Sequence, residues 1–155
     1  FTFGVLKIWV KRGINLDVGG GDPYVVITMA DQSVETRVVR NDVHPIWNEV
    51  LKIYVLDPTC PVSLTVRDHN KLSNMDNKMG NAVIDIKPLV QAVTVHQNGL
   101  PNGTIITRIL PSSSNCMSKE SSIVWEDGRV IQDMCLKLEN AECGQVELQL
   151  RWIDI

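Results

Sequence analysis

The chain has 155 residues, of which 44% are hydrophobic and 21% charged, and its formal net charge is −3. Such a length and composition are typical of one globular domain with its own hydrophobic core. The acidic balance argues against nucleic acid as a partner, because nucleic-acid-binding domains carry basic patches. No apolar run reaches the about 18 residues that a membrane-spanning helix needs.

Most of the chain is predicted to form short β-strands, because β-branched and aromatic residues recur between turn-forming residues. In chain order, the predicted strands cover 5–10, 24–29, 33–40, 49–55, 62–66, 82–86 and 145–153. Pro88 begins a segment that can form one or two helical turns. Glu126-Asp127-Gly128 lies between two apolar runs and predicts a hairpin. Many short strands at this spacing indicate an antiparallel β-sandwich.

Two acidic loops, at 15–25 and 66–80, each follow one apolar run and precede another. Their candidate metal-binding carboxylates are Asp17, Asp22, Asp68 and Asp76. If the sandwich brings both loops to one end, these carboxylates converge, and converging carboxylates favour a hard cation such as calcium, which takes about six to eight oxygen ligands. The alternative is that they are ordinary turn residues, because Asp and Asn side chains bond to nearby backbone groups.

The motifs around these loops resemble those of C2 domains. The first loop continues into Pro23-Tyr24-Val25, and the second contains Asp68-His69-Asn70 and, further on, Met79-Gly80. Between the loops, residues 43–49 read Val-His-Pro-Ile-Trp-Asn-Glu, similar to a stretch of the same family. The resemblance covers roughly the first 85 residues.

The remainder of the chain resembles a narrower group, the small plant C2-domain proteins linked to abscisic-acid signalling, whose relatives include a rice C2 protein described as a GTPase activator. The segments that carry this resemblance are 100–106, 120–125 and 142–154. The resemblance implies an all-β fold, an eight-stranded antiparallel C2 sandwich formed by a single domain over 1–155. It also implies a partly helical or irregular insertion at about 88–124, attributed in the group to partner binding.

The resemblance further implies a calcium site with five ligand positions. Four of them hold the carboxylates named above, and the fifth holds Asn70, whose amide oxygen coordinates without a formal charge. Calcium affinity rises with ligand charge, so this substitution predicts weaker binding, above all of a second ion. Arg67 stands where many relatives have an aromatic residue, and its charge opposes calcium. A degenerate site that keeps the fold without the ion therefore stays open.

Calcium at the loops predicts binding to anionic phospholipid, because the ion cancels the acidic charge and bridges to phosphate oxygens. Leu72 and Met75, in the second loop, are candidates for insertion among lipid headgroups, with about 1–2 kcal/mol gained by each if it is well buried. Packing within the loop is the alternative for both side chains.

C2 relatives often bind phosphoinositides on a concave strand pair, which predicts a second lipid surface. Its candidate residues here are Arg37, Arg40, Lys52 and Trp47. Glu35 and Asp42 add negative charge to the same region and leave only a small net attraction. A solvated strand face, with Trp47 used for packing, is the alternative.

No catalytic constellation is recognised, so the chain is not expected to be an enzyme. His44, His69 and His96 do not have the spacing of a zinc site, and no nucleophile elbow or phosphate-binding loop occurs. The four cysteines lack a Cys-x-x-Cys spacing, which favours reduced thiols and leaves a disulfide open.

Together with the acidic loops, the resemblance to the plant group implies a calcium-dependent phospholipid-binding adaptor that recruits a signalling partner, such as an abscisic-acid receptor, to the plasma membrane. The expected locations are the cytoplasm and the periphery of the plasma membrane, with the nucleus as a further location. One alternative is a regulator of a GTPase or ATPase, for which Arg12, Arg108 and Arg129 are candidate arginine fingers. Another is a C2 interaction module that works without calcium.

Overall fold

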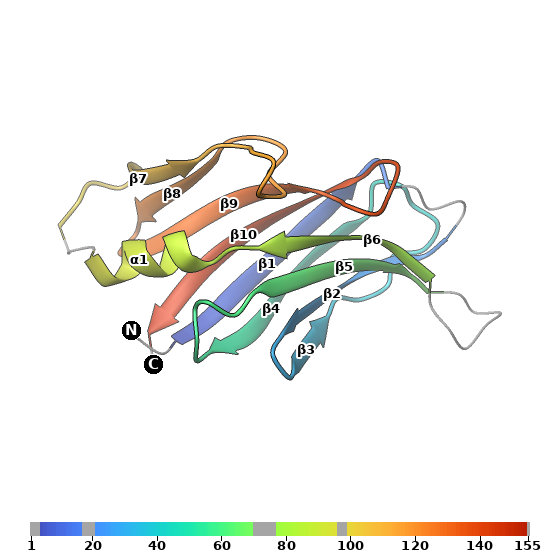
Figure 1. The fold of residues 1–155 in the computed structure, drawn as a ribbon, viewed down its shortest axis with the longest axis horizontal. Helices are drawn as coiled ribbons and strands as arrows, with labels where there is room; N and C mark the ends of the chain where they lie inside the picture. The colour runs from blue at the N-terminus through green and yellow to red at the C-terminus, as the bar shows by residue number, and fades with distance from the viewer. Residues whose placement is uncertain (1–3, 17–20, 70–76, 96–98, 155) are drawn as a thin grey trace.

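The computed structural model describes residues 4–16, 21–69, 77–95 and 99–154 (Figure 1). These residues form ten strands and one helix. In chain order the elements are β1 (Gly4–Ile14), β2 (Pro23–Met29), β3 (Gln32–Glu35), β4 (Ile46–Val55), β5 (Val62–Asp68), β6 (Asn77–Ile84), α1 (Lys87–Val95), β7 (Thr104–Ile109), β8 (Ser121–Glu126), β9 (Arg129–Lys137) and β10 (Gln145–Asp154).

The strands form two antiparallel sheets that pack face to face (Figure 1). The six-stranded sheet has the order β4-β1-β10-β9-β8-β7, and the four-stranded sheet has the order β3-β2-β5-β6. The start of β1 and the end of β10 lie side by side at one end of the sandwich, beside α1. The start of β2 and the end of β5 lie at the opposite end, which we call the loop end.

The core fills the space between the sheets because inward positions alternate with outward ones along each strand. On β10, Val146, Leu148, Leu150 and Trp152 are buried, and on β1 the buried residues are Leu6, Ile8 and Val10. Each such side chain stabilises the fold by about 1.5–3 kcal/mol through removal from water. The strand predicted at 145–153 is therefore confirmed, and its burial alternates except at Gln149, which is buried as well.

The predicted C2 sandwich is confirmed, with more strands than the eight expected. β8 and β9 form the hairpin predicted at Glu126-Asp127-Gly128, and β7, which was not predicted, pairs with β8 and extends the six-stranded sheet. α1 begins at the start of the predicted insertion, where the Asp85 carboxylate accepts a hydrogen bond from the Lys87 backbone N–H at 3.0 Å. No helix among the described residues is long and apolar enough to cross a bilayer.

The predicted strand at 33–40 is shorter in the structure, since β3 ends at Glu35. Just after β3 ends, the Thr36 hydroxyl, and not a backbone carbonyl, accepts a hydrogen bond from the Val25 backbone N–H at 3.0 Å. The chain then follows β2 without forming a regular strand, and the Val39 N–H donates to the Pro23 carbonyl at 3.0 Å. This course places segment 36–45 next to the start of β2.

Candidate metal and lipid site

Asp22 and Asp68 meet at the loop end of the four-stranded sheet. Asp68 is the last residue of β5 and pairs with Pro23, the first residue of β2. The Asp22 backbone N–H donates to Asp68 Oδ1 at 2.7 Å, and the His69 N–H donates to the Asp22 carbonyl at 2.9 Å. Two acidic residues from loops far apart in sequence are thus held side by side by backbone hydrogen bonds.

Segment 36–45 also orients the Asp22 carboxylate. The Asn41 backbone N–H donates to Asp22 Oδ1 at 3.0 Å, and Asn41 has a left-handed φ of 50°, which asparagine adopts more readily than most residues. This contact turns one carboxylate oxygen toward the backbone. The direction of the side chain is therefore set before any ligand arrives.

Gly21 leaves the space that the Asp68 carboxylate fills. A Cβ atom added at Gly21 would overlap all three carboxyl atoms of Asp68. Any other residue at this position would have to displace the carboxylate or the backbone of the first loop. The glycine is therefore required by the close approach of the two loops.

The donor set of this pair suits a hard cation. Asp22 and Asp68 offer carboxylate oxygens, and calcium prefers oxygen ligands of this kind. Among the described residues, no group of three or more His, Cys, Asp or Glu side chains forms a metal cluster, so the described part of the site is this pair. The other predicted ligands and the predicted inserting residues lie outside the described residues: Asp17, Asn70, Asp76, Leu72 and Met75.

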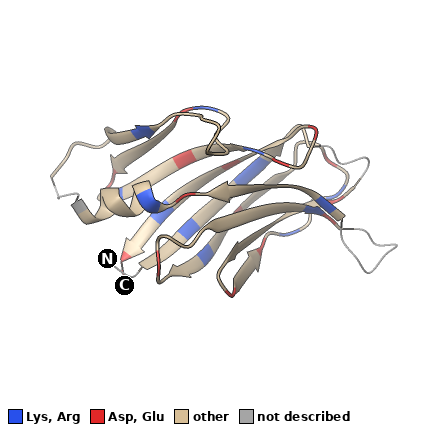
Figure 2. Cartoon of the chain, in the orientation of Figure 1, with Lys and Arg blue, Asp and Glu red and all other residues tan. Residues whose placement is uncertain are grey.

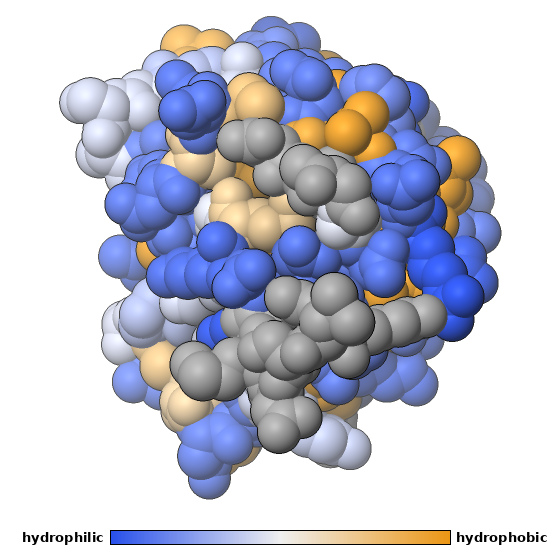
Figure 3. Space-filling model, turned by 90° about the vertical axis from the view of Figure 1, so that its right-hand side faces the viewer, coloured by the Kyte–Doolittle hydropathy of each residue, from blue (hydrophilic) through white to orange (hydrophobic). Residues whose placement is uncertain are grey.

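Arg67 precedes Asp68 on β5, and successive side chains of a strand point to opposite faces. Val66 is buried between the sheets, which puts Arg67 on the outer face and Asp68 on the side of Val66. The side chains of Arg67 and Asp68 therefore leave β5 on opposite faces of the sheet. Around the loop end, the described surface is mostly hydrophilic (Figure 3).

The predicted second lipid surface is divided in the structure. Arg37 and Arg40 are exposed on the segment after β3, whereas Lys52 is exposed on β4 in the other sheet. Trp47 has no exposed surface, and its Nε1–H donates to the Pro23 carbonyl at 3.1 Å. Its assignment to a lipid-contacting surface is therefore wrong, because the ring fills the core and ties β4 to the start of β2.

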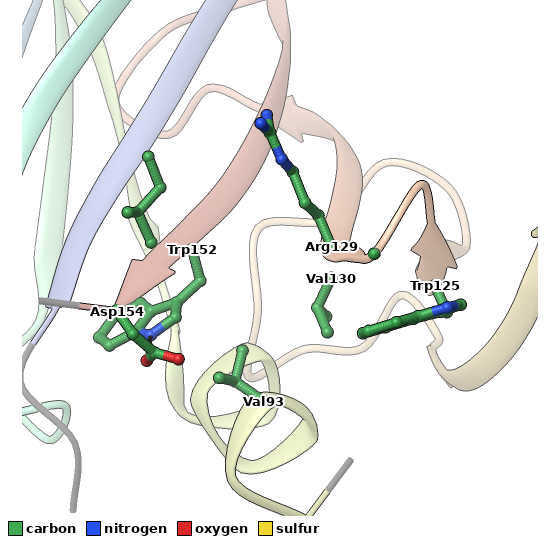
Figure 4. A pocket seen from close by; sticks show the side chains of 8 residues that line it. Val93, Trp125, Arg129, Val130, Trp152 and Asp154 are labelled. Carbon is green, nitrogen blue, oxygen red and sulfur yellow. Dashed lines mark hydrogen bonds between the residues drawn. The ribbon is translucent and has the colours of Figure 1, made fainter. Parts of the chain in front are cut away.

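A cavity of about 380 Å³ lies at the end of the sandwich opposite the acidic pair (Figure 4). Val93 of α1, Trp125 and Trp152 form apolar walls, and Arg129 and Asp154 lie at its edge. Trp152 is oriented by its Nε1–H, which donates to Asp154 Oδ1 at 2.8 Å. Sequence reasoning missed this cavity, because its walls come from elements that only the fold brings together.

The C2 domain family matches residues 4–100 of the chain. Protein C2-DOMAIN ABA-RELATED 1 of Arabidopsis thaliana is 49% identical over 158 residues, which cover 98% of this chain and 94% of that protein. Protein C2-DOMAIN ABA-RELATED 4 of the same plant is 48% identical over 155 residues, covering 98% and 87%. The chain belongs to the C2-domain ABA-related family.

GTPase activating protein 1 of Oryza sativa subsp. indica is also related, with 41% identity over 155 residues, 98% of this chain and 93% of the rice protein. Among solved structures, a C2 domain of plant Extended Synaptotagmin 1 aligns with a TM-score of 0.65 at 22% identity, covering 100% of this chain and 98% of that one. A calcium-bound pair of C2 domains from Extended-Synaptotagmin 2 aligns with the same TM-score at 19% identity, covering 99% and 47%. At this sequence identity, the two structural similarities show that the chain shares the fold of these domains.

Membership in the family implies a general membrane-binding role for this C2-domain ABA-related protein, and C2 domains commonly bind calcium. The family is not known to contain enzymes.

Proposed function

We propose that this C2-domain ABA-related protein is a calcium-dependent phospholipid-binding adaptor, which carries a signalling partner such as an abscisic-acid receptor from the cytoplasm to the plasma membrane. The observation that carries the proposal is the convergence of Asp22 and Asp68, joined by the 2.7 Å hydrogen bond from the Asp22 N–H to Asp68 Oδ1. The names of the Arabidopsis relatives support the link to abscisic acid.

Charge explains how the two carboxylates would make membrane binding depend on calcium. With a net charge of −3 and acidic side chains at the loop end, the protein is repelled by an anionic lipid surface. Bound calcium supplies positive charge that lipid phosphate oxygens can share. Asp22 and Asp68 hold their oxygens in place through backbone contacts, so little side-chain ordering remains to oppose binding.

Exposed apolar side chains in the insertion support a partner-binding role for it. Leu100 and Ile105 are 39% and 44% exposed, and Leu110 is 65% exposed. They lie on or beside β7, the free edge of the six-stranded sheet. Apolar side chains on a free strand edge are suited to contact with another protein.

Calcium titration calorimetry and vesicle sedimentation test the proposal. Asp22→Asn combined with Asp68→Asn keeps the shape of both side chains, and the amide oxygen introduced at position 68 can still accept the Asp22 N–H. We expect saturable calcium binding and calcium-dependent sedimentation of the wild type with phosphatidylserine vesicles, and loss of both in this variant. The matched control is Asp31→Asn with Glu126→Gln, which removes the same charge from two exposed positions. Sedimentation of the first variant at the wild-type level would contradict the proposal.

A second candidate function, regulation of a nucleotide hydrolase, is favoured by the name of the rice relative. Arg12 is paired with Glu147 at 2.7 Å and Arg108 with Glu120 at 3.8 Å. Arg129 is exposed, and no carboxylate of the described residues forms a salt bridge with it. Arg129→Lys should therefore abolish acceleration of GTP hydrolysis by the GTPase on which the rice relative acts, while Arg108→Lys should retain it. Full acceleration by Arg129→Lys would exclude an arginine finger at this position.

A further inference from the structure

Three basic residues stand in a row on the outer face of the six-stranded sheet. Lys7 of β1 pairs directly with Lys52 of β4 on one side and with Arg151 of β10 on the other. Directly paired residues share one face of a sheet, and neighbouring strands lie about 4.8 Å apart, so the row spans about 10 Å at the backbone. Figure 2 shows the three basic segments side by side across β10, β1 and β4.

This basic row lacks the counter-charges that neighbouring cations have. Further along β1, Lys11 lies 3.4 Å from an Asp133 carboxylate oxygen and Arg12 lies 2.7 Å from a Glu147 oxygen. Within the described part of the chain, no carboxylate lies within 4.0 Å of the charged groups of Lys7, Lys52 or Arg151. Like charges placed directly opposite each other on a sheet destabilise it. The row therefore destabilises the fold, and a bound anionic ligand would remove this destabilisation.

A cavity of about 310 Å³ adjoins the row and adds an apolar wall. It is lined by Lys7, Trp9, Asn48, Val50 and Arg151. The Trp9 ring is fixed because its Nε1–H donates to Asn48 Oδ1 at 2.8 Å, and Val50 is 52% exposed. The Arg151 guanidinium is also oriented, since its Nε–H donates to Gln149 Oε1 at 2.8 Å. The site is thus built before a ligand arrives, with Trp9 two residues from Lys7 on the same face of β1 and Lys11 Nζ lying 4.7 Å from the centre of its ring.

The row runs across the strands, and this direction determines which kind of anion can contact all three cations. An acidic peptide lying along β4 would run perpendicular to the row. Its side chains on one face repeat about every 6.6 Å, so it would bring only one carboxylate to the row. A phosphate group carries about −1.5 to −2 charges, and arginine binds it through two parallel hydrogen bonds. Three cations within about 10 Å therefore match a compact anion with two or more phosphates.

We propose that this face binds a compact polyphosphate of the inositol phosphate class, with its phosphates on Lys52, Lys7 and Arg151 and its ring against Trp9. The ligand chemistry has two sources, a soluble inositol phosphate or the headgroup of a phosphoinositide. The site lies on the outer face of the six-stranded sheet, whereas Asp22 and Asp68 lie at the loop end of the four-stranded one. Binding here requires no calcium.

The first test is calorimetry with inositol trisphosphate and a calcium chelator. Lys7→Gln with Lys52→Gln should weaken binding about tenfold or more, because each lysine is a charged partner of the ligand. The control, Lys87→Gln with Lys137→Gln, removes the same charge from exposed positions outside the row and should bind like the wild type. Arg151 is left intact because it also borders a second cavity that contains Glu126 and Asp127. Equal weakening in both variants, or no binding by the wild type, would overturn the proposal.

A second pair of variants leaves every cation in place. Val50→Glu puts a negative charge into the cavity from an exposed position, and Val83→Glu, at a residue 48% exposed on β6 of the other sheet, is its control. We expect only Val50→Glu to abolish binding, with unchanged thermal unfolding of both proteins. Retention of full affinity by folded Val50→Glu would place the ligand elsewhere.

Vesicles then identify the source of the phosphates. With chelator present, sedimentation with vesicles that contain phosphatidylinositol bisphosphate, lost in Lys7→Gln with Lys52→Gln, supports the site and assigns it to a lipid headgroup. Binding of the free trisphosphate without sedimentation supports the site and assigns it to a soluble ligand. Equal sedimentation with phosphatidylserine vesicles would show unspecific attraction and contradict the proposal. Since calcium is absent throughout, failure of the calcium-dependent function leaves these outcomes unchanged.

Discussion

The acidic pair at the loop end and the basic row on the six-stranded sheet are opposite in charge and in construction. Asp22 and Asp68 are placed by backbone hydrogen bonds at strand ends, beside a glycine that makes room for them. Lys7, Lys52 and Arg151 are placed by strand register alone. The contrast teaches that one sandwich can hold two charged sites, one dependent on close loop approach and the other on the alignment of three strands.

The largest expected effect comes from the residue that supports the loop end through the core. Trp47→Ala removes a fully buried ring and the hydrogen bond from its Nε1–H to the Pro23 carbonyl. We expect a loss of about 3–5 kcal/mol in the free energy of unfolding, measured by urea denaturation. The control Ile46→Ala, at a residue 64% exposed, should change stability by less than about 0.5 kcal/mol. Equal effects of the two variants would show that Trp47 does not tie β4 to β2.

Gly21→Ala perturbs the acidic pair alone. Its Cβ atom would overlap the Asp68 carboxylate, so we expect a loss of about 1–3 kcal/mol in unfolding free energy together with loss of calcium-dependent vesicle sedimentation. Adding Asp68→Ala relieves the overlap and should restore part of the stability without restoring calcium dependence. A double-mutant cycle with no coupling between the two positions would refute the close approach.

A pH titration distinguishes a paired cation from the unpaired row. The hydrogen bond from Arg12 lowers the pKa of Glu147, and the charges of Arg12, Lys119 and Lys11 add to this effect against the opposing effect of burial. The ion pair between Arg12 and Glu147 therefore stabilises the fold fully above pH 4.5, the ordinary pKa of a glutamate side chain. This stabilisation is lost as the pH falls through the lower pKa that Glu147 has in the folded state. Acid unfolding of Glu147→Gln should show a shallower pH dependence in this range than the wild type. An unchanged pH dependence would contradict the assignment.

Lys52→Gln should change the free energy of unfolding least of these variants, and it should raise the stability instead of lowering it. At low salt, removing one of three adjacent like charges should raise the free energy of unfolding by about 0.2–1 kcal/mol. The gain should fade as the salt concentration rises, since salt screens exposed charges. Lys11→Gln is the control, because Lys11 is paired with Asp133 and its removal should bring no gain. A loss of stability in Lys52→Gln at low salt would mean that the row is compensated.

Much of the sandwich could be predicted because strand signals are local. β10 alternates between buried and half-buried residues over most of its length, and its period is visible in the chain. β7 could not be recognised in the same way, since as an edge strand it contains exposed and half-buried residues and no fully buried one. Trp47 was equally ambiguous, because a tryptophan in a strand can face either the core or a ligand, and only packing decides which.

The sequence by itself determined the antiparallel sandwich, the two acidic loops and the family, because periodicity and motif spacing are properties of neighbouring residues. Only the tertiary structure decided that Asp22 meets Asp68, that Lys52 stands with Lys7 and Arg151 instead of with Arg37 and Arg40, and that Trp125 and Trp152 share a cavity. The physical reason is register. The partner of a residue on the next strand is set by turns and by the burial of one face over the whole sheet, and no local pattern specifies it.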